Sequence, residues 1–241
     1  MKSYLNDQKL QQQALQQLQK AIDNELLLQD PHSIYRDHYW NEGKGSAIGC
    51  IGQSNDLATI ATQLGIPIQI LKIQNHIFQF LEKEKAQQFS VDFLNAIPVG
   101  QDIRAVWKKY FIWLLAEVDH STLDRLQHID LAKTAIELSV QTLKQLITED
   151  IPTTKLEGII KEINAYRRIV GQGADAGAIE PEYAGWELAK AHCVLEAVLN
   201  PSYINHILPQ GGPSAMWDFL AEQFLAFITQ GKATQNTYYY D

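Results

Sequence analysis

The segment from residue 35 to residue 52 concentrates side chains that commonly take part in chemistry. It holds a histidine, a cysteine, three aromatic residues and four glycines in eighteen positions. Irregular segments that carry such residues on a helical scaffold are common positions of binding and catalytic sites. Seven residues are therefore our ligand-binding candidates: Tyr35, His38, Tyr39, Trp40, Glu42, Lys44 and Cys50.

Cys50 and His38 are the pair that would support nucleophilic catalysis. A neighbouring histidine lowers the pKa of a thiol, and Asn41 or Asp37 could orient the imidazole. Such a site would make the chain a hydrolase or a transferase. However, Cys50 lies between two isoleucines, where a cysteine is more often a small buried apolar residue. Catalysis therefore stays the alternative to a binding function, and no catalytic residue is assigned.

The glycines do not have the spacing of a phosphate-binding loop. A P-loop reads Gly-x-x-x-x-Gly-Lys-Ser/Thr after a strand, whereas here Lys44 follows Gly43 and the next hydroxyl, Ser46, comes one position too late. The spacing Gly-x-Gly-x-x-x-Gly also departs from the dinucleotide-binding fingerprint. The simpler interpretation is a tight connection in which glycine allows close approach or positive φ.

The histidines do not predict a metal site. None of the seven pairs with another at the i, i+3 or i, i+4 spacing that places two ligands on one helical face. Glu117-Val-Asp-His120 is a single Glu-x-x-His motif, and di-iron bundles need two of these with two further glutamates. We expect no metal ion and no cofactor.

Composition limits the partners of the chain. The formal net charge is −8 at pH 7 and the pI is near 5.4, so the average field repels nucleic acids and anionic membranes. Two widely separated cysteines and a glutamine-rich N-terminal region without a secretory pattern favour the cytoplasm. The expected partner is a small ligand or another protein, and a homo-oligomer is compatible with either.

Hydrophobic periodicity predicts an all-α fold, a compact bundle of roughly eight to ten helices. Ser54 is expected to cap a helix that has Asp56 in its first turn and stops at Gly65, and Ser90 is expected to begin another. Capping boxes are predicted at Ser121 and at Thr154. The stretch 46–51 is the sole conceivable strand. We expect one domain over 1–241, with a subdivision near 121 into 1–120 and 121–233, and a loose tail at 234–241.

Four motifs resemble those of a family of uncharacterised bacterial proteins. They are Gly45-Ser-Ala-Ile-Gly-Cys50, Leu64-Gly-Ile-Pro67, Ile77-Phe78 and Phe93-Leu-Asn-Ala-Ile-Pro-Val-Gly100. The resemblance covers about residues 38 to 115 and implies no reaction, because the family has no established activity. Where its members have a first cysteine this chain has Ser46, so a two-cysteine site at 46 and 50 cannot operate here.

Three hypotheses for function follow. The first is a cytoplasmic helical protein that binds a partner or a small ligand, and we favour it because no catalytic constellation is complete. The second is the hydrolase or transferase around His38 and Cys50. The third, compatible with the first, is a subunit that forms a homo-oligomer through an apolar helix face.

Overall fold

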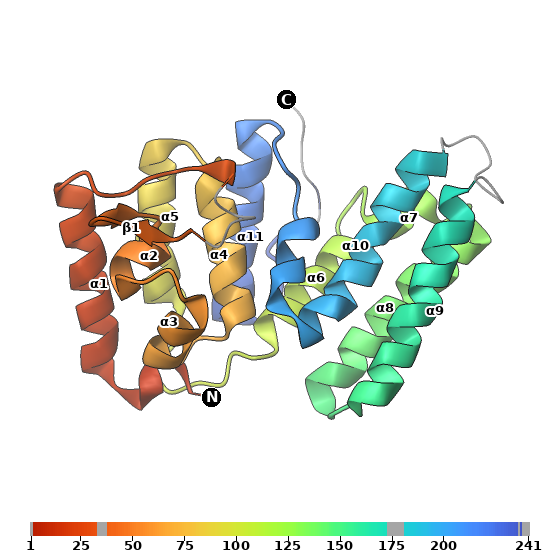
Figure 1. The fold of residues 1–241 in the computed structure, drawn as a ribbon, viewed down its shortest axis with the longest axis horizontal. Coiled ribbons are helices and arrows are strands. Elements are labelled where there is room, and N and C mark those ends of the chain that lie inside the picture. The colour runs from red at the N-terminus through yellow and green to blue at the C-terminus, as the bar shows by residue number, and fades with distance from the viewer. Residues whose placement is uncertain (1, 33–37, 173–180, 236, 238–241) are drawn as a thin grey trace. The chain divides into compact units, whose positions relative to one another are not determined.

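The structure, a computed structural model, describes residues 2–32, 38–172, 181–235 and 237. Within these residues the chain is almost entirely helical, which confirms the all-α prediction (Figure 1). The number of described helices slightly exceeds the expected eight to ten. The eleven described α-helices are α1 (Gln8–Asp23), α2 (Ala47–Gly52), α3 (Leu57–Leu64), α4 (Ile68–Phe80), α5 (Lys83–Ala96), α6 (Val106–Ala116), α7 (Thr122–Leu126), α8 (Asp130–Thr148), α9 (Thr153–Gly171), α10 (Pro181–Leu199) and α11 (Ser214–Gln230).

Short elements complete the described chain. Two 3₁₀-helices lie at Ser3–Asn6 (η1) and Pro201–His206 (η3). The strands β1 (Trp40–Asn41) and β2 (Lys44–Gly45) form a two-stranded antiparallel hairpin. No helix in the described ranges combines the length and the apolar character needed to cross a bilayer.

Two compact units divide the chain by their internal contacts. Unit 1 comprises residues 1–107 and 208–232, and unit 2 comprises 108–207 and 233–241. Helix α11 therefore packs with the N-terminal elements rather than with its sequence neighbours. The subdivision expected near residue 121 is linear along the chain, whereas this division is not.

Helix α4 is the core of unit 1. Helices α3, α5 and α11 and the short α2 contact it, and α1 packs against α2 and α5. Ten of its thirteen residues are buried, far more than the single apolar stripe predicts. Helix α11 adds Trp217, which stacks on Phe80 with ring centroids 4.6 Å apart. The same elements thus surround α4 and support the segment 38–52.

Three long helices, α8, α9 and α10, pack against one another to form unit 2. Gly171 and Gly185 allow α9 and α10 to approach closely, since a Cβ on Gly185 would lie 3.0 Å from the Gly171 Cα. The buried Glu187 carboxylate accepts hydrogen bonds from Arg125 Nη2 at 2.7 Å and from Lys190 Nζ at 2.9 Å. Burial lowers the pKa of Lys190, and the Glu187 carboxylate opposes that change. This cluster links α7 to α10.

The predicted helix ends have mixed outcomes. Gly65, the C-cap of α3, is left-handed as expected, and the Ser121 hydroxyl accepts from the Asp124 amide. Three expectations are wrong. Asp56 rather than Ser54 caps α3, Ser90 lies inside α5, and α9 begins at Thr153 after Pro152 without a Thr154 capping box. The stretch 46–51 forms the cap and body of α2.

Candidate functional site

The segment 38–52 folds as the β1–β2 hairpin followed directly by α2. Trp40 pairs with Gly45, and Asn41 with Lys44. The turn residues Glu42 and Gly43 both have positive φ, at 49° and 89°, as a tight two-residue hairpin turn requires. Ser46 then caps α2, because its hydroxyl accepts a hydrogen bond from the Gly49 amide.

The glycines of this segment are needed for close backbone packing. The Tyr39 carbonyl accepts a hydrogen bond from the Ser46 amide at 2.9 Å. A Cβ added to Gly45 would lie 2.1 Å from that carbonyl oxygen, and one added to Gly49 would lie 1.7 Å from it. Both distances are far below a van der Waals contact, so side chains are excluded at both positions. The close-approach interpretation of the glycines is confirmed.

A cavity of about 190 Å³, which we call the hairpin pocket, lies beside the hairpin. It brings together four of the seven candidate residues, His38, Tyr39, Trp40 and Lys44. The other lining residues come from the hairpin, from the segment before it and from α4: Leu28, Asp30, Asn41, Gly45, Ser46 and Gln79.

Charged groups of both signs border the hairpin pocket. His38, Lys44 and Asp30 are all exposed. Among the described residues, neither the His38 imidazole nor the Lys44 ammonium has a hydrogen-bond or ion-pair partner. The Asp30 carboxylate accepts from the His32 amide at 3.0 Å. The pocket therefore offers two basic groups and one carboxylate to a ligand.

Polar contacts hold the wall of this pocket. The Asn55 Oδ1 atom accepts from the Tyr39 and Trp40 amides at 2.8 and 2.7 Å. The buried Lys72 ammonium donates to the Tyr39 hydroxyl at 3.1 Å, and Gln79 Oε1 accepts from the Asp30 amide at 2.6 Å. Sequence reasoning missed these three supporting residues. Lys72 alone offered a signal, as a charged residue near the apolar stripe of α4.

Two of the sequence candidates lie outside this arrangement. Glu42 is exposed at the hairpin turn and does not line the pocket. Cys50 is buried within α2. Tyr35, like Asp37, lies outside the described residues.

The surroundings of Cys50 weigh against a nucleophile. Its Sγ atom donates to the carbonyls of Gly45 at 3.6 Å and Leu26 at 3.7 Å. Burial raises the pKa of the thiol to about 11, although the Gly45 contact acts in the opposite direction. A nucleophilic cysteine needs a depressed pKa. In the described part of the chain no histidine hydrogen-bonds this sulfur, and His38 is exposed while Cys50 is buried.

The described residues also hold no group of three histidine, cysteine, aspartate or glutamate side chains that could ligate a metal ion. The hairpin pocket has a single carboxylate beside its imidazole, which is fewer ligands than a protein zinc site uses. Its arrangement suits ionic and hydrogen-bonded contacts to an organic molecule.

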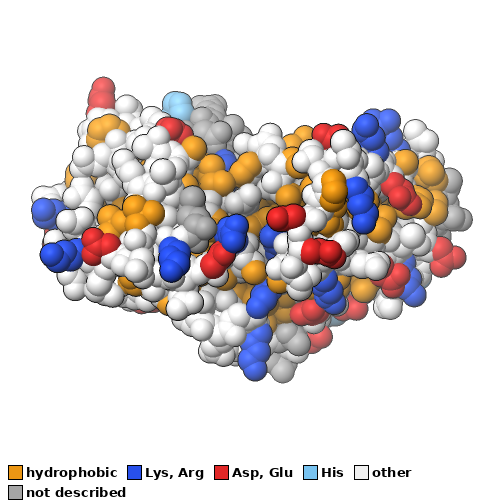
Figure 2. Space-filling view, turned by 90° about the horizontal axis from the view of Figure 1, so that it is seen from below, with side chains coloured by type: hydrophobic (Ala, Val, Ile, Leu, Met, Phe, Trp, Pro, Cys, Tyr) orange, Lys and Arg blue, Asp and Glu red, His pale blue; other side chains and the backbone are white. Residues whose placement is uncertain are grey.

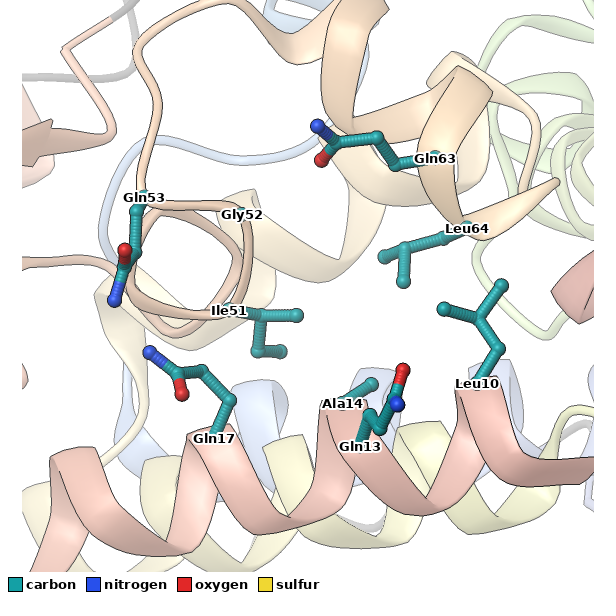
Figure 3. A pocket seen from close by; sticks show the side chains of 9 residues that line it. All are labelled: Leu10, Gln13, Ala14, Gln17, Ile51, Gly52, Gln53, Gln63 and Leu64. Carbon is teal, nitrogen blue, oxygen red and sulfur yellow. The ribbon is translucent and has the colours of Figure 1, made fainter.

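A second and larger cavity, the glutamine pocket, has a volume of about 460 Å³ and lies between α1, α3 and the end of α2 (Figure 3). Four glutamines line it: Gln13, Gln17, Gln53 and Gln63. The remaining lining residues are apolar or glycine: Leu10, Ala14, Ile51, Gly52 and Leu64. Gln13 and Gln17 lie on the glutamine-rich face of α1, where Gln13 is exposed and Gln17 is half-buried.

Comparisons with known proteins found no match to this chain among family models, curated proteins or solved structures. The resemblance to an uncharacterised bacterial family therefore stays a prediction.

Proposed function

We propose that this chain is a binding protein for a small polar metabolite, which it holds in the hairpin pocket. The observation that carries the proposal is the gathering of His38, Lys44 and Asp30 around one cavity. The two basic side chains are available to a ligand, because neither has a partner among the described residues.

The size and charges of the pocket favour a ligand that carries both signs. Pockets for drug-sized ligands measure roughly 300–1,000 Å³, so a cavity of about 190 Å³ suits a smaller molecule. A free amino acid fits this description. Its carboxylate would meet Lys44 and His38, its ammonium group would meet Asp30, and Tyr39 and Trp40 would contact its apolar part.

Isothermal titration with the twenty standard amino acids tests the proposal, with acetate and methylammonium as ligands of a single charge. We expect at least one amino acid to bind, and to bind more tightly than either single-charge ligand. Backbone NMR should place the shifted amides at residues 38–46. If no amino acid shifts those amides, the proposal is wrong.

Lys44→Gln is the matching variant. It removes a charge at an exposed hairpin position and should weaken binding about fivefold, the effect of one solvent-exposed ionic contact. Lys83→Gln is the control, because Lys83 is an exposed lysine on α5 that does not line the pocket. Equal weakening by both variants would indicate a general charge effect rather than a contact in the site.

The remaining expectations belong to the same proposal. Two free, buried cysteines favour a cytoplasmic location, and the family resemblance suggests a bacterial protein. The acidic net charge disfavours binding to nucleic acids and membranes. On the face shown in Figure 2, basic and acidic side chains are interspersed without a large basic area. Sedimentation at micromolar concentration would decide whether a homo-oligomer forms.

A further inference from the structure

The glutamine pocket differs from most of the protein surface because no charged side chain lines it. Within the described part of the chain, none of its four glutamine carboxamides has a hydrogen-bond partner. An ionised group that contacts this lining gains no counter-charge from it. The lining therefore selects a neutral ligand.

The carboxamides come from separate elements and surround an apolar floor. Gln13 and Gln17 extend from α1, Gln53 from the C-cap of α2 and Gln63 from α3 (Figure 3). The side chains of Leu10, Ile51 and Leu64 point into the space between these elements. A ligand can thus lay an apolar face on the floor while its edge reaches the glutamines.

A glutamine carboxamide has a carbonyl acceptor and an amide donor in one plane. Its best partner is an edge with the opposite arrangement, a ring nitrogen or carbonyl beside an N–H group, as when glutamine binds adenine through two hydrogen bonds. Nucleobases carry such edges around a flat ring with apolar faces. The cavity volume of about 460 Å³ lies in the range of small-molecule pockets.

We propose that the glutamine pocket binds the base of a free, uncharged nucleoside. The base lies on the apolar floor, and its hydrogen-bonding edge meets the carboxamides. A phosphate group opposes binding, because the lining supplies no cation. This site is independent of the amino-acid site proposed at the hairpin pocket.

Calorimetric titration of the full-length protein with adenosine and uridine tests the proposal, with AMP and ribose as comparison ligands. The expected result is that at least one nucleoside binds, that AMP binds at least several-fold more weakly than adenosine, and that ribose does not bind. Two results would overturn the proposal: absence of binding by both nucleosides, or AMP binding at least as tightly as adenosine.

Variants of α1 locate the binding. Gln13→Ala removes a lining carboxamide and should weaken nucleoside binding roughly three- to tenfold, the net effect of one neutral hydrogen bond. Gln12→Ala is the matched control, since the exposed Gln12 is the neighbouring position on the same helix and does not line the pocket. Equal affinity of these two variants would contradict the proposed position of the ligand.

Discussion

The hairpin pocket and the glutamine pocket adjoin opposite ends of the same short helix. Ser46, the N-cap of α2, lines the first, and Gln53, its C-cap, lines the second. Charged side chains of both signs border the hairpin pocket, whereas only uncharged side chains line the glutamine pocket. The hairpin pocket can therefore be recognised from its reactive residue types, whereas the glutamine pocket can be recognised only from the packing of α1, α2 and α3.

The body of α2 separates the two pockets and is buried from Ala47 to Cys50. Its position is fixed by the close contact of Gly45 and Gly49 with the Tyr39 carbonyl. Displacement of α2 would alter both cavities, whereas substitution of an exposed lining residue would alter one.

The largest expected effect is that of Gly49→Ala. The new Cβ would meet the backbone of Tyr39 and Trp40, which cannot rotate away, so α2 or β1 must shift. We expect a loss of about 3 kcal/mol in the free energy of unfolding, the range found when buried positions are overpacked. Urea denaturation followed by circular dichroism measures this change, and NMR should detect altered amides at both pockets.

Gly158→Ala is the control for that substitution. Gly158 is exposed on α9, and an added Cβ would meet nothing within 4 Å. Replacement of glycine by alanine in a helix should therefore stabilise the chain by roughly 0.5–1 kcal/mol. If Gly49→Ala proved as stable as this control, the close-packing argument would fail.

The next largest expected effect is a loss of folding stability at alkaline pH that depends on Cys50. Its pKa is raised from 9.0 to about 11 in the folded chain. Between these values the unfolded chain has lost the proton that the folded chain retains, so stability is full below about pH 9 and falls as pH rises toward 11. A pKa shift of two units lowers the free energy of unfolding by at most about 2–3 kcal/mol.

Denaturation at a series of pH values checks this prediction. Cys50→Ala should show a shallower fall in the free energy of unfolding above pH 9 than the wild-type chain. Cys193, whose pKa burial also raises to about 11, provides the matched variant Cys193→Ala with a similar change in slope. An unchanged slope in Cys50→Ala would mean that burial does not raise the pKa of Cys50, and only a difference in slope below pH 9 would indicate a depressed pKa and restore the nucleophile hypothesis.

A pair of glycine variants separates binding from stability at the glutamine pocket. Gln53 has φ 48° and ψ 42°, a left-handed conformation that glycine adopts without strain, so Gln53→Gly should stabilise the chain by about 0.5–1 kcal/mol. Gln63→Gly, inside α3, should destabilise it by a similar amount. Both remove a lining carboxamide, and calorimetry should therefore find weaker nucleoside binding in both. If only the destabilised variant Gln63→Gly bound nucleoside more weakly, the result would argue against direct contacts between the ligand and the glutamines.

Local sequence signals were sufficient for most of the fold. Gly65 marked the end of α3 because a left-handed glycine acts within a few residues, whereas the cap is Asp56 and not the expected Ser54, two positions earlier. Ser90 misled for a local reason as well. Its hydroxyl donates to the Ala86 carbonyl at 2.8 Å, the other arrangement in which a helix accommodates serine.

Residues 46–51 were harder to interpret because α2 is short and buried. A brief apolar run has no usable period, so a strand and a helix are not distinguished. The capping hydroxyl of Ser46 was the signal that favoured a helix.

The candidate site was predicted in part. His38, Tyr39, Trp40 and Lys44 were found because they are close in sequence and chemically conspicuous. Asp30 and Gln79 join them only through the packing of distant segments. The glutamine pocket depends wholly on such packing, since Gln17 and Gln63 acquire a common environment only when α1 lies beside α3. No property of either residue alone predicts that the two line the same cavity.

The smallest expected effect is the response of each pocket to salt. Raising the ionic strength from about 0.1 M to 1 M shortens the screening length from ~10 Å to ~3 Å. Amino-acid binding at the exposed charges of Lys44 and Asp30 should weaken a few-fold, whereas nucleoside binding should change less than about twofold, because no charge lines the glutamine pocket. Calorimetry in sodium chloride measures both affinities in one protein. Equal weakening of the two ligands would mean that charge does not distinguish the pockets, and the assignment of a neutral ligand to the second would have to be abandoned.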